Sequence, residues 1–158
     1  MYRMVQRISA RGRTDAPPSV VYALLRDGAS WPRWSPLGSF TLLKEASDGD
    51  EGLGALRQFR TGRTTSCEEV VELVPDRRFS YALKSGLPLR GYRADVDLTA
   101  LPEAEGGGTE IHWHSTFRPK VPGTGWFFRR VLGRFLVRMV DGLVAYTAGK
   151  REAEDHAQ

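Results

Sequence analysis

Strand-length runs in which apolar and polar residues alternate fill the middle of the chain. Between residues 39 and 118, short clusters of glycine, proline and polar residues separate six such runs. The connections are shorter than the crossover that a parallel pair of strands requires. The pattern therefore predicts consecutive antiparallel strands that pair as a meander, at residues 39–46, 54–62, 64–74, 77–85, 89–99 and 108–118.

The residues before this run predict one more strand and two short helices. Residues 4–13 alternate moderately and predict the first strand. Asp15 can cap a following helix that accepts two prolines in its first turn and ends near Gly28. A second, very short helix is expected at residues 30–36, with Ser30 as its candidate cap.

After residue 122 the spacing of apolar residues becomes helical. Apolar side chains recur three or four positions apart, and arginines occupy other positions of the helical wheel. This predicts a long amphipathic C-terminal helix, which is the only large element available to cover one face of the sheet. Its apolar positions are Phe128, Val131, Leu132, Phe135, Met139, Leu143 and Tyr146.

Four motifs occur within this order of elements. They are the Trp-Pro-Arg-Trp-Ser-Pro segment at residues 31–36, the run at residues 68–81, Gly-Thr-Glu-Ile-His-Trp at residues 108–113 and Phe-Arg-Pro at residues 117–119. In combination they resemble the polyketide cyclase/dehydrase and lipid-transport branch of the START-like SRPBCC superfamily. The resemblance covers roughly residues 3–150.

The resemblance implies an α+β helix-grip fold. In that fold a seven-stranded curved antiparallel sheet wraps around the long C-terminal helix, two short helices follow the first strand, and an apolar cavity lies between sheet and helix. Members are often carriers or binders of hydrophobic molecules, and some catalyse aromatic cyclisation or dehydration of polyketides. Fold is implied more strongly than function.

Composition limits the remaining choices. With 158 residues the chain has the size of a single domain, expected over residues 1–158 with an ordered core of about 3–150. The single cysteine, Cys67, excludes an internal disulfide framework and a multi-thiolate metal site. The N-terminal residues lack the apolar core of a signal peptide, and no run approaches the roughly 18 apolar residues of a membrane-spanning helix. We therefore expect a cytoplasmic location.

Strand alternation assigns side chains to the inner face of the sheet. It places Trp113 and Phe117 inward on one strand, Tyr92 on another and Tyr81 on a third. For Trp31 and Trp34 two roles stay open, a rim at the cavity mouth or a plug where the short helix meets the sheet. We expect the ligand to contact an apolar wall made of Trp31, Trp34, Phe59, Tyr81, Tyr92, Trp113, Phe117, Phe128, Phe135 and Met139.

A few polar residues could orient a ligand in that wall. The candidates are Arg57, Glu68, Tyr81, Arg90 and Tyr92. In an enzyme, Glu68 would take an α-proton while Tyr81 or Arg57 polarised a ketone. The alternative, which we favour, is an Arg57–Glu68 pair across adjacent strands. The alternation along residues 64–74 leaves the face of Glu68 undecided.

Two other polar clusters are weaker candidates for a functional site. His112 and His114 have the spacing of two metal ligands on one strand, but the sequence offers no clear third ligand. We interpret them, and the neighbouring pair Asp95 and Asp97, as the solvent-facing exterior of the sheet. No metal site and no organic cofactor are expected, and no phosphate loop or nucleophile motif occurs.

Positive charge is concentrated near the C-terminus. Residues 121–151 carry six basic residues and one acidic residue, against 17 and 15 in residues 1–120. Base-stacking aromatics do not interleave with the arginines, so we expect no nucleic-acid partner. A basic amphipathic helix can dock transiently on an anionic membrane, although we favour a solvated outer face because the apolar side of the helix is already taken up by the sheet. The arginines concerned are Arg129, Arg130, Arg134 and Arg138.

The favoured hypothesis is therefore the binding or transport of a hydrophobic small molecule, lipid-like or polyketide-like, in an internal cavity. The alternative is a cofactor-independent aromatase/cyclase or dehydrase that acts on a poly-β-keto or aromatic substrate in the same cavity. The two hypotheses differ in whether titratable groups with shifted proton affinities converge inside that cavity.

Overall fold

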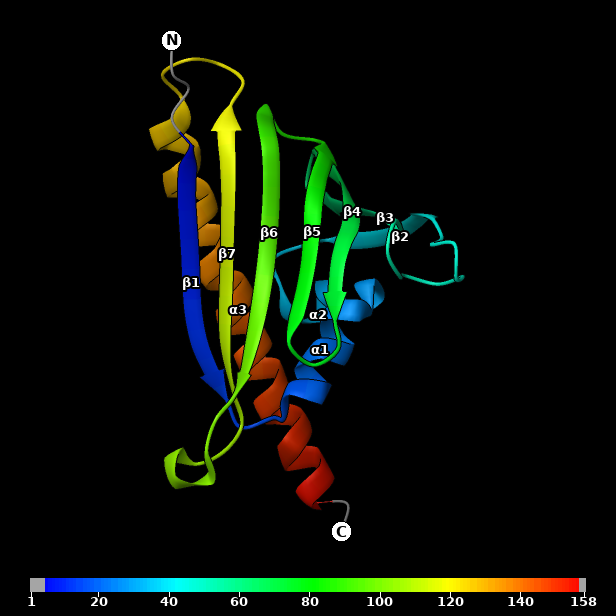
Figure 1. Cartoon of the computed structure of the whole chain (residues 1–158), viewed down its shortest axis with the longest axis vertical. Coiled ribbons are helices and arrows are strands. Elements are labelled where there is room, and N and C mark those ends of the chain that lie inside the picture. Colours follow the sequence, from blue (N-terminus) through cyan, green and yellow to red (C-terminus); the bar gives the residue numbers. More distant parts are fainter. Residues whose placement is uncertain (1–4, 157–158) are drawn as a thin grey trace.

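An antiparallel sheet forms the larger layer of the molecule (Figure 1). The structure is a computed structural model that describes residues 5–156, and the side chains of residues 5–148. Residues 3 and 4 of the expected core lie outside the described residues. Within the described part, the strand order is β1-β7-β6-β5-β4-β3-β2. The strands are β1 (Gln6–Thr14), β2 (Ser39–Lys44), β3 (Leu56–Thr61), β4 (Thr64–Val74), β5 (Arg78–Ser85), β6 (Leu89–Ala100) and β7 (Thr109–Pro119).

The expected meander from β2 to β7 is confirmed, and β1 adds to it at the β7 edge. The first strand pairs antiparallel with the last one, with Gln6 opposite Phe117 and Ala10 opposite Trp113. The two most distant strands in sequence are therefore neighbours in the sheet. The observed strand ends differ from the expected ones by up to two residues.

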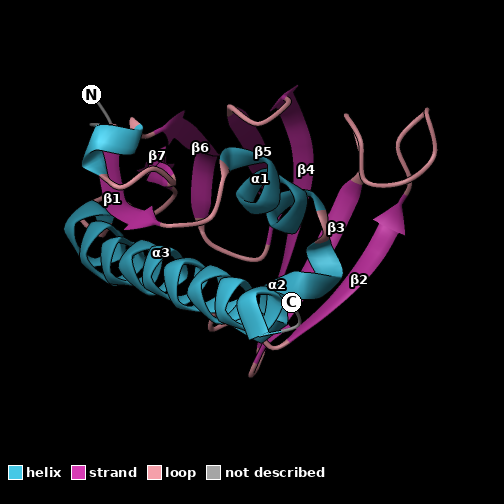
Figure 2. Cartoon of the chain, turned by 90° about the horizontal axis from the view of Figure 1, so that it is seen from below, coloured by secondary structure: helices cyan, strands magenta, loops and turns pink. Residues whose placement is uncertain are grey.

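Two short helices and the C-terminal helix lie on the concave side of the sheet, which curls around them (Figure 2). This is the helix-grip arrangement that the resemblance implies. Helix α3 contacts β1 and β7 along its length, and α2 packs against it. A Cβ at Gly142 of α3 would lie 1.7 Å from the Trp34 carbonyl oxygen, so glycine permits this close approach. The helices are α1 (Pro18–Arg26), α2 (Trp31–Trp34) and α3 (Gly125–His156), with 3-10 turns η1 (Gly28–Ser30) and η2 (Glu103–Glu105).

One expected helix cap, Asp15, is wrong, and the other, Ser30, occupies the N-cap position of α2 without making a side-chain cap hydrogen bond. Helix α1 begins after Pro17, whose backbone is extended (φ −69°, ψ 158°), because a residue before proline disfavours the helical region. Asp15 therefore lies too early to be the cap. Ser30 has helical backbone angles because η1 leads directly into α2. Its hydroxyl lies 2.7 Å from the Asp27 carbonyl oxygen and accepts the indole N–H of Trp34 at 3.1 Å.

Alternation along the strands divides the sheet into an apolar inner face and a polar outer face. On β7 every second residue is buried, and the inward set includes Trp113 and Phe117 as expected. Tyr92 and Tyr81 are also inward and buried. On β4 the undecided case resolves in favour of Glu68, which is buried on the inner face together with Val70.

Candidate functional site

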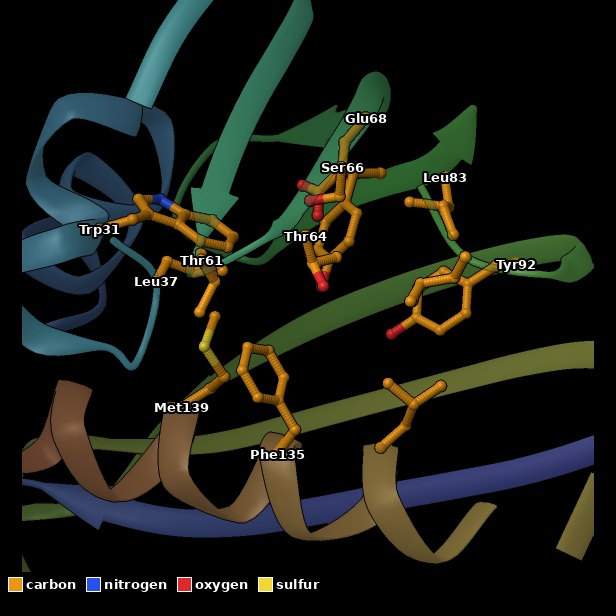
Figure 3. Close-up of a pocket in the computed structure, with 13 residues that line it drawn as sticks. Trp31, Leu37, Thr61, Thr64, Ser66, Glu68, Leu83, Tyr92, Phe135 and Met139 are labelled. Carbon is orange, nitrogen blue, oxygen red and sulfur yellow. The ribbon is translucent and has the colours of Figure 1, made fainter. Parts of the chain in front are cut away.

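A cavity of about 220 Å³ lies between α3 and the inner face of strands β4, β5 and β6 (Figure 3). An engineered cavity of about 150 Å³ is large enough to hold benzene. The space here is about one and a half times as large, which suits a fused-ring or short acyl group. Its wall is mostly apolar with a few hydroxyls and one carboxyl, formed by Trp31, Leu37, Thr61, Thr64, Ser66, Glu68, Tyr81, Leu83, Leu87, Tyr92, Leu132, Phe135 and Met139.

Glu68 supplies the one carboxyl group of the cavity wall. The pairing of β4 with β5 shifts register on both sides of it, between Cys67 and Glu68 and between Val70 and Glu72. Bulges of this kind re-aim side chains, and they are frequent beside functional sites. Within the described residues, no hydrogen bond or ion pair reaches the Glu68 carboxyl group. Burial raises its pKa to about 7, although the charge of Arg57 acts to lower it.

Two tyrosines stand beside this carboxyl group. Burial raises the pKa of Tyr92 to about 12 and holds the pKa of Tyr81 well above its usual value. Both phenols therefore stay protonated at neutral pH and can donate hydrogen bonds. The Tyr92 hydroxyl lies 3.1 Å from the hydroxyl of Ser115, and the rings of Tyr81 and Tyr92 are 6.4 Å apart.

Arg57 is enclosed by side chains and does not line the cavity. It is 1% exposed, and its guanidinium carbon lies 4.7 Å from the Trp31 ring centroid and 5.1 Å from that of Phe79. Nη1 donates to the Leu25 carbonyl oxygen at 3.0 Å, and Nε lies 3.5 Å from Glu51 Oε1. Burial lowers the pKa of Arg57, whereas Glu51 acts to raise it.

Arg57 and Glu68 are neighbours across adjacent strands, as expected, but they do not form the expected ion pair. The two residues stand opposite each other on β3 and β4. The ion pair within 4.0 Å forms with Glu51 instead, whose Oε1 also accepts the backbone N–H of Gly28 at 3.0 Å. Sequence reasoning missed Glu51 because it lies in an irregular loop, where no periodicity indicates which way a side chain faces.

The residues expected to contact a ligand fall into two groups. Five of them line the cavity: Trp31, Tyr81, Tyr92, Phe135 and Met139. Of the others, Trp34, Phe59, Trp113 and Phe117 are buried in the surrounding core, and Phe128 packs against that core while partly exposed. Arg90 is exposed at the surface.

The two tryptophans of α2 are buried, which favours the plug over the rim. Trp31 is 0% exposed and donates its indole N–H to the Leu25 carbonyl oxygen at 3.1 Å, while one side of its ring borders the cavity. Trp34 packs against Trp31 with 5.1 Å between ring centroids. Sequence reasoning also missed the lining residues Ser66 and Thr64. They lie on the same face of β4 as Glu68, so a correct prediction that Glu68 faces inward would have identified them too.

The outer face of the sheet carries a polar network, as expected for Asp95 and Asp97. Asp97 accepts two bonds from Arg78, from Nε at 2.6 Å and from Nη2 at 3.1 Å. Asp95 accepts from Ser80 and from Arg93. Asp97 also contacts His114 at 2.7 Å, so a carboxylate joins the histidine pair for which the sequence offered no third group.

The first turns of α3 expose aromatic and basic side chains. Trp126 is 62% exposed and Phe127 is 48% exposed, and a surface groove beside them is lined by three of the four arginines noted above. Leu132 and Phe135 line both this groove and the cavity, so the two features share a wall. Within the part of the chain that the structure describes, no helix is long and apolar enough to cross a membrane.

Known proteins share this fold. A family model described as polyketide cyclase / dehydrase and lipid transport matches residues 6–148. A START superfamily protein from Mycobacterium smegmatis superposes with a TM-score of 0.76 at 14% identity, over 90% of this chain and 97% of that one. The protein XoxI from Bacillus cereus gives 0.72 at 18% identity, over 90% and 95%. Ara h 8.0201 gives 0.64 at 17% identity, over 90% and 99%. No curated protein matches the chain significantly.

Proposed function

The chain belongs to the polyketide cyclase/dehydrase and lipid transport family, and we propose that it binds or carries a hydrophobic small molecule, lipid-like or polyketide-like, in the cavity beneath α3. The observation that carries this proposal is the unfilled apolar space between helix and sheet. Protein interiors are otherwise close-packed, so an apolar recess of this size with a few polar groups in its wall is a candidate binding site for a hydrophobic ligand.

The polar groups of the wall indicate what kind of hydrophobic molecule fits. Glu68 is protonated in about half of the molecules near pH 7, because its pKa is about 7. Tyr81 stays protonated and can donate. A ligand with one hydroxyl or keto group on an apolar body would satisfy these groups, and a purely aliphatic ligand would leave Glu68 without a hydrogen bond.

The first experiment asks whether a guest occupies the cavity. Native mass spectrometry of protein purified from its host should reveal a retained small molecule, and 2-naphthol should bind the emptied protein more tightly than naphthalene does. Leu83→Trp, which fills the cavity, should abolish both the retention of a small molecule and the binding of 2-naphthol. Leu43→Trp on the exposed face of β2 is the matched control and should bind normally. Absence of retained ligand together with absence of 2-naphthol binding would contradict the proposal.

A second candidate function is catalysis in the same cavity, which the raised pKa of Glu68 favours. A carboxyl group with a pKa of about 7 is matched to proton transfer at neutral pH. Glu68 would accept the α-proton of a poly-β-keto chain, and Tyr81 would donate a hydrogen bond to the enolate oxygen that forms. The enolate carbon would then attack a second carbonyl carbon and close the ring, and the alkoxide formed there would take back the proton held by Glu68. Arg57 has no part in this scheme because it does not line the cavity.

The test of catalysis separates the two functions. Glu68→Gln and Tyr81→Phe should each lower the rate of cyclisation of a poly-β-keto substrate by about 100-fold or more, while 2-naphthol binding persists. Glu69→Gln, which changes the neighbouring half-exposed carboxylate, is the control and should leave the rate unchanged. Wild-type protein that binds the substrate without converting it would leave carriage as the function.

We also propose that the exposed start of α3 docks on an anionic membrane during loading. Three arginines line the groove beside Trp126 and Phe127, so the patch complements negatively charged lipid headgroups and offers aromatic side chains to the interface. Because Leu132 and Phe135 border both groove and cavity, a membrane bound there would lie next to the apolar space.

Vesicle co-sedimentation tests this docking. Wild-type protein should bind vesicles that contain phosphatidylserine, and salt should weaken the binding. Arg130→Glu with Arg134→Glu should reduce the affinity at least about 30-fold, since each basic residue near the surface contributes about 1 kcal/mol. Lys44→Glu with Arg77→Glu makes the same charge change at exposed sites on other strands and turns, and should bind almost normally. Equal binding of both variants would contradict the proposal.

A further inference from the structure

Three groups with metal-ligating atoms meet on the outer face of the sheet, away from the cavity. His112 and His114 project from the same face of β7, and Asp97 lies opposite His112 on β6. His114 Nε2 is 2.7 Å from Asp97 Oδ2, and the two imidazole rings stack with 4.5 Å between centroids. One ligating atom from each of the three residues lies within 4.8 Å of the other two.

We propose that Asp97, His112 and His114 form a binding site for a zinc-class divalent transition-metal ion. Two imidazoles and one carboxylate are ligands that zinc and its neighbours bind well. Ligand atoms about 2.1 Å from an ion stand roughly 3 to 4 Å apart, so the widest separation in this cluster, 4.8 Å at most, must shorten by about 1 to 2 Å, and the 2.7 Å contact between His114 and Asp97 must lengthen slightly. All three side chains are half-buried, which leaves them the freedom to make that adjustment.

The proposed ion would bind between His114 Nε2 and Asp97 Oδ2, the two atoms that are in contact in the metal-free protein. Because a carboxylate can only accept, the tautomer of His114 that fits this contact carries its proton on Nε2 and donates it to Asp97 Oδ2. When the ion binds, the His114 proton moves to Nδ1, and the lone pair freed on Nε2 coordinates the metal together with Oδ2. No charge is left unpaired by this exchange, because the carboxylate now faces a cation instead of an N–H.

Arg78 is the strongest objection to a cation here, since it donates to both oxygens of Asp97. Each carboxylate oxygen has two lone pairs, so these bonds leave one on Oδ2 that faces His114. Arg78 then orients the ligating carboxylate, as outer partners commonly do at metal sites. Its charge is shared with Glu72 and Asp95, which lie 3.5 and 3.7 Å from its Nη1.

The open side of the cluster distinguishes it from a closed structural site. Both histidines border a shallow surface groove, together with Arg7 and Ser9 of β1 and Thr116 of β7. With three protein ligands, the ion would keep at least one position for water or a small anion facing that groove. The site would therefore be exchangeable and independent of the ligand cavity on the other face of the sheet.

Zinc titration by calorimetry on tag-free full-length protein tests the proposal. Wild-type protein should bind one Zn²⁺ per chain, and bound Co²⁺ should give the visible absorption bands of a low-coordinate site. His112→Ala and His114→Ala should each weaken binding about tenfold or more, and the double variant should not bind at this site. Both changes remove half-exposed side chains, so circular dichroism should show an unchanged fold.

Controls separate the cluster from adventitious histidine binding. Asp97→Asn should weaken Zn²⁺ binding about tenfold, whereas Asp95→Asn should leave it unchanged, because Asp95 is engaged by Ser80 and Arg93. His156→Ala, which removes the third histidine of the sequence, should also bind normally. Wild-type protein that takes up no Zn²⁺, or a double histidine variant that binds as wild type does, would overturn the proposal.

Discussion

Arg57 and Glu68 stand opposite each other on neighbouring strands and are both buried, yet their surroundings differ in kind. Arg57 is enclosed by four aromatic rings, a carbonyl oxygen and the Glu51 carboxylate. Glu68 faces the cavity, and no side chain of the described residues bonds to it. The charge of Arg57 therefore has a counter-ion within the protein, whereas the carboxyl group of Glu68 faces a cavity that can hold a ligand.

This difference separates a structural residue from a site residue. Burial of an ionisable group is costly unless partners compensate it, and Arg57 is compensated in part by Glu51 and by the Leu25 carbonyl oxygen, although burial still lowers its pKa and its Nε and Nη2 make no hydrogen bond among the described residues. It joins the end of α1 to β3 through Leu25, and thereby seats Trp31 against the sheet. For Glu68, burial disfavours the ionised carboxylate, and this is the reason why its pKa is raised. A carboxyl group held in this way in a cavity is a candidate for ligand contact or proton transfer.

The largest expected effect comes from removing the compensated charge. Arg57→Met should lower the free energy of unfolding by about 3 kcal/mol, because it leaves the Glu51 carboxylate without its cation and removes one of the two donors to the Leu25 carbonyl oxygen. Arg60→Met on the same strand is the control, because Arg60 is exposed, and should change stability by less than about 0.5 kcal/mol. Urea denaturation measures both. A loss below about 1 kcal/mol for Arg57→Met would show that the Glu51 ion pair and the Leu25 hydrogen bond contribute little to stability.

The next effect is the pH dependence that Glu68 imposes. A carboxyl pKa of 4.5 in the unfolded chain and about 7 in the folded one means that the folded state holds a proton longer. The stabilisation that the protonated Glu68 gives to the folded state is fully present below pH 4.5 and is lost as the pH rises through about 7. The total loss of stability is about 3 kcal/mol. Glu68→Gln should therefore equal wild type in stability at pH 4 and exceed it by up to about 3 kcal/mol at pH 8.

A matched variant isolates this effect from other titrations. Glu69→Gln alters the next carboxylate along β4, which is half-exposed and lies 3.1 Å from Lys84. It should gain no stability as the pH rises. Urea midpoints at pH 4, 6 and 8 for wild type and both variants give the comparison, and parallel curves for wild type and Glu68→Gln would contradict the raised pKa.

A smaller loss is expected when Glu51 is neutralised. Glu51→Gln keeps an oxygen that can accept the Gly28 N–H but removes the charge beside Arg57. Burial raises the pKa of Glu51, although the charge of Arg57 acts to lower it, so relief of the buried carboxylate offsets most of the lost attraction and we expect a loss of less than about 1 kcal/mol at neutral pH. Thermal or urea unfolding measures it. Asp48→Asn in the same loop, at an exposed position, should leave stability unchanged.

Much of the fold could be predicted from the sequence, because alternation and helical spacing are local properties. The strands from β2 to β7 and helix α3 follow directly from them. The cap geometry could not be predicted, since the backbone of Ser30 depends on the 3-10 turn before it. Alternation also does not reveal which edge of the sheet β1 joins. That pairing is set by α3, which packs against β1 and β7 together.

The site was harder to predict because it depends on register and on void space. The extra residue at Val71 interrupts the alternation of β4 just after Glu68 and Val70, and no residue type in that strand signals it. Asp97 meets His112 and His114 only through the register of β6 with β7, which is itself shifted between Arg90 and Arg93. Whether aromatic residues line a cavity or fill a core is a question of volume, and half of the expected wall proved to be core.

The smallest effect is also the most direct measure of the comparison, because it asks which carboxylate Arg57 depends on. Double-mutant cycles that combine Arg57→Met with Glu51→Gln, and separately with Glu68→Gln, isolate the two couplings. Since only Glu51 lies within ion-pair distance, its coupling should exceed that of Glu68 by about 1 kcal/mol at pH 7. Equal couplings would mean that Arg57 compensates both carboxylates alike. Glu68 would then be a partner of the fold rather than a group kept for a guest.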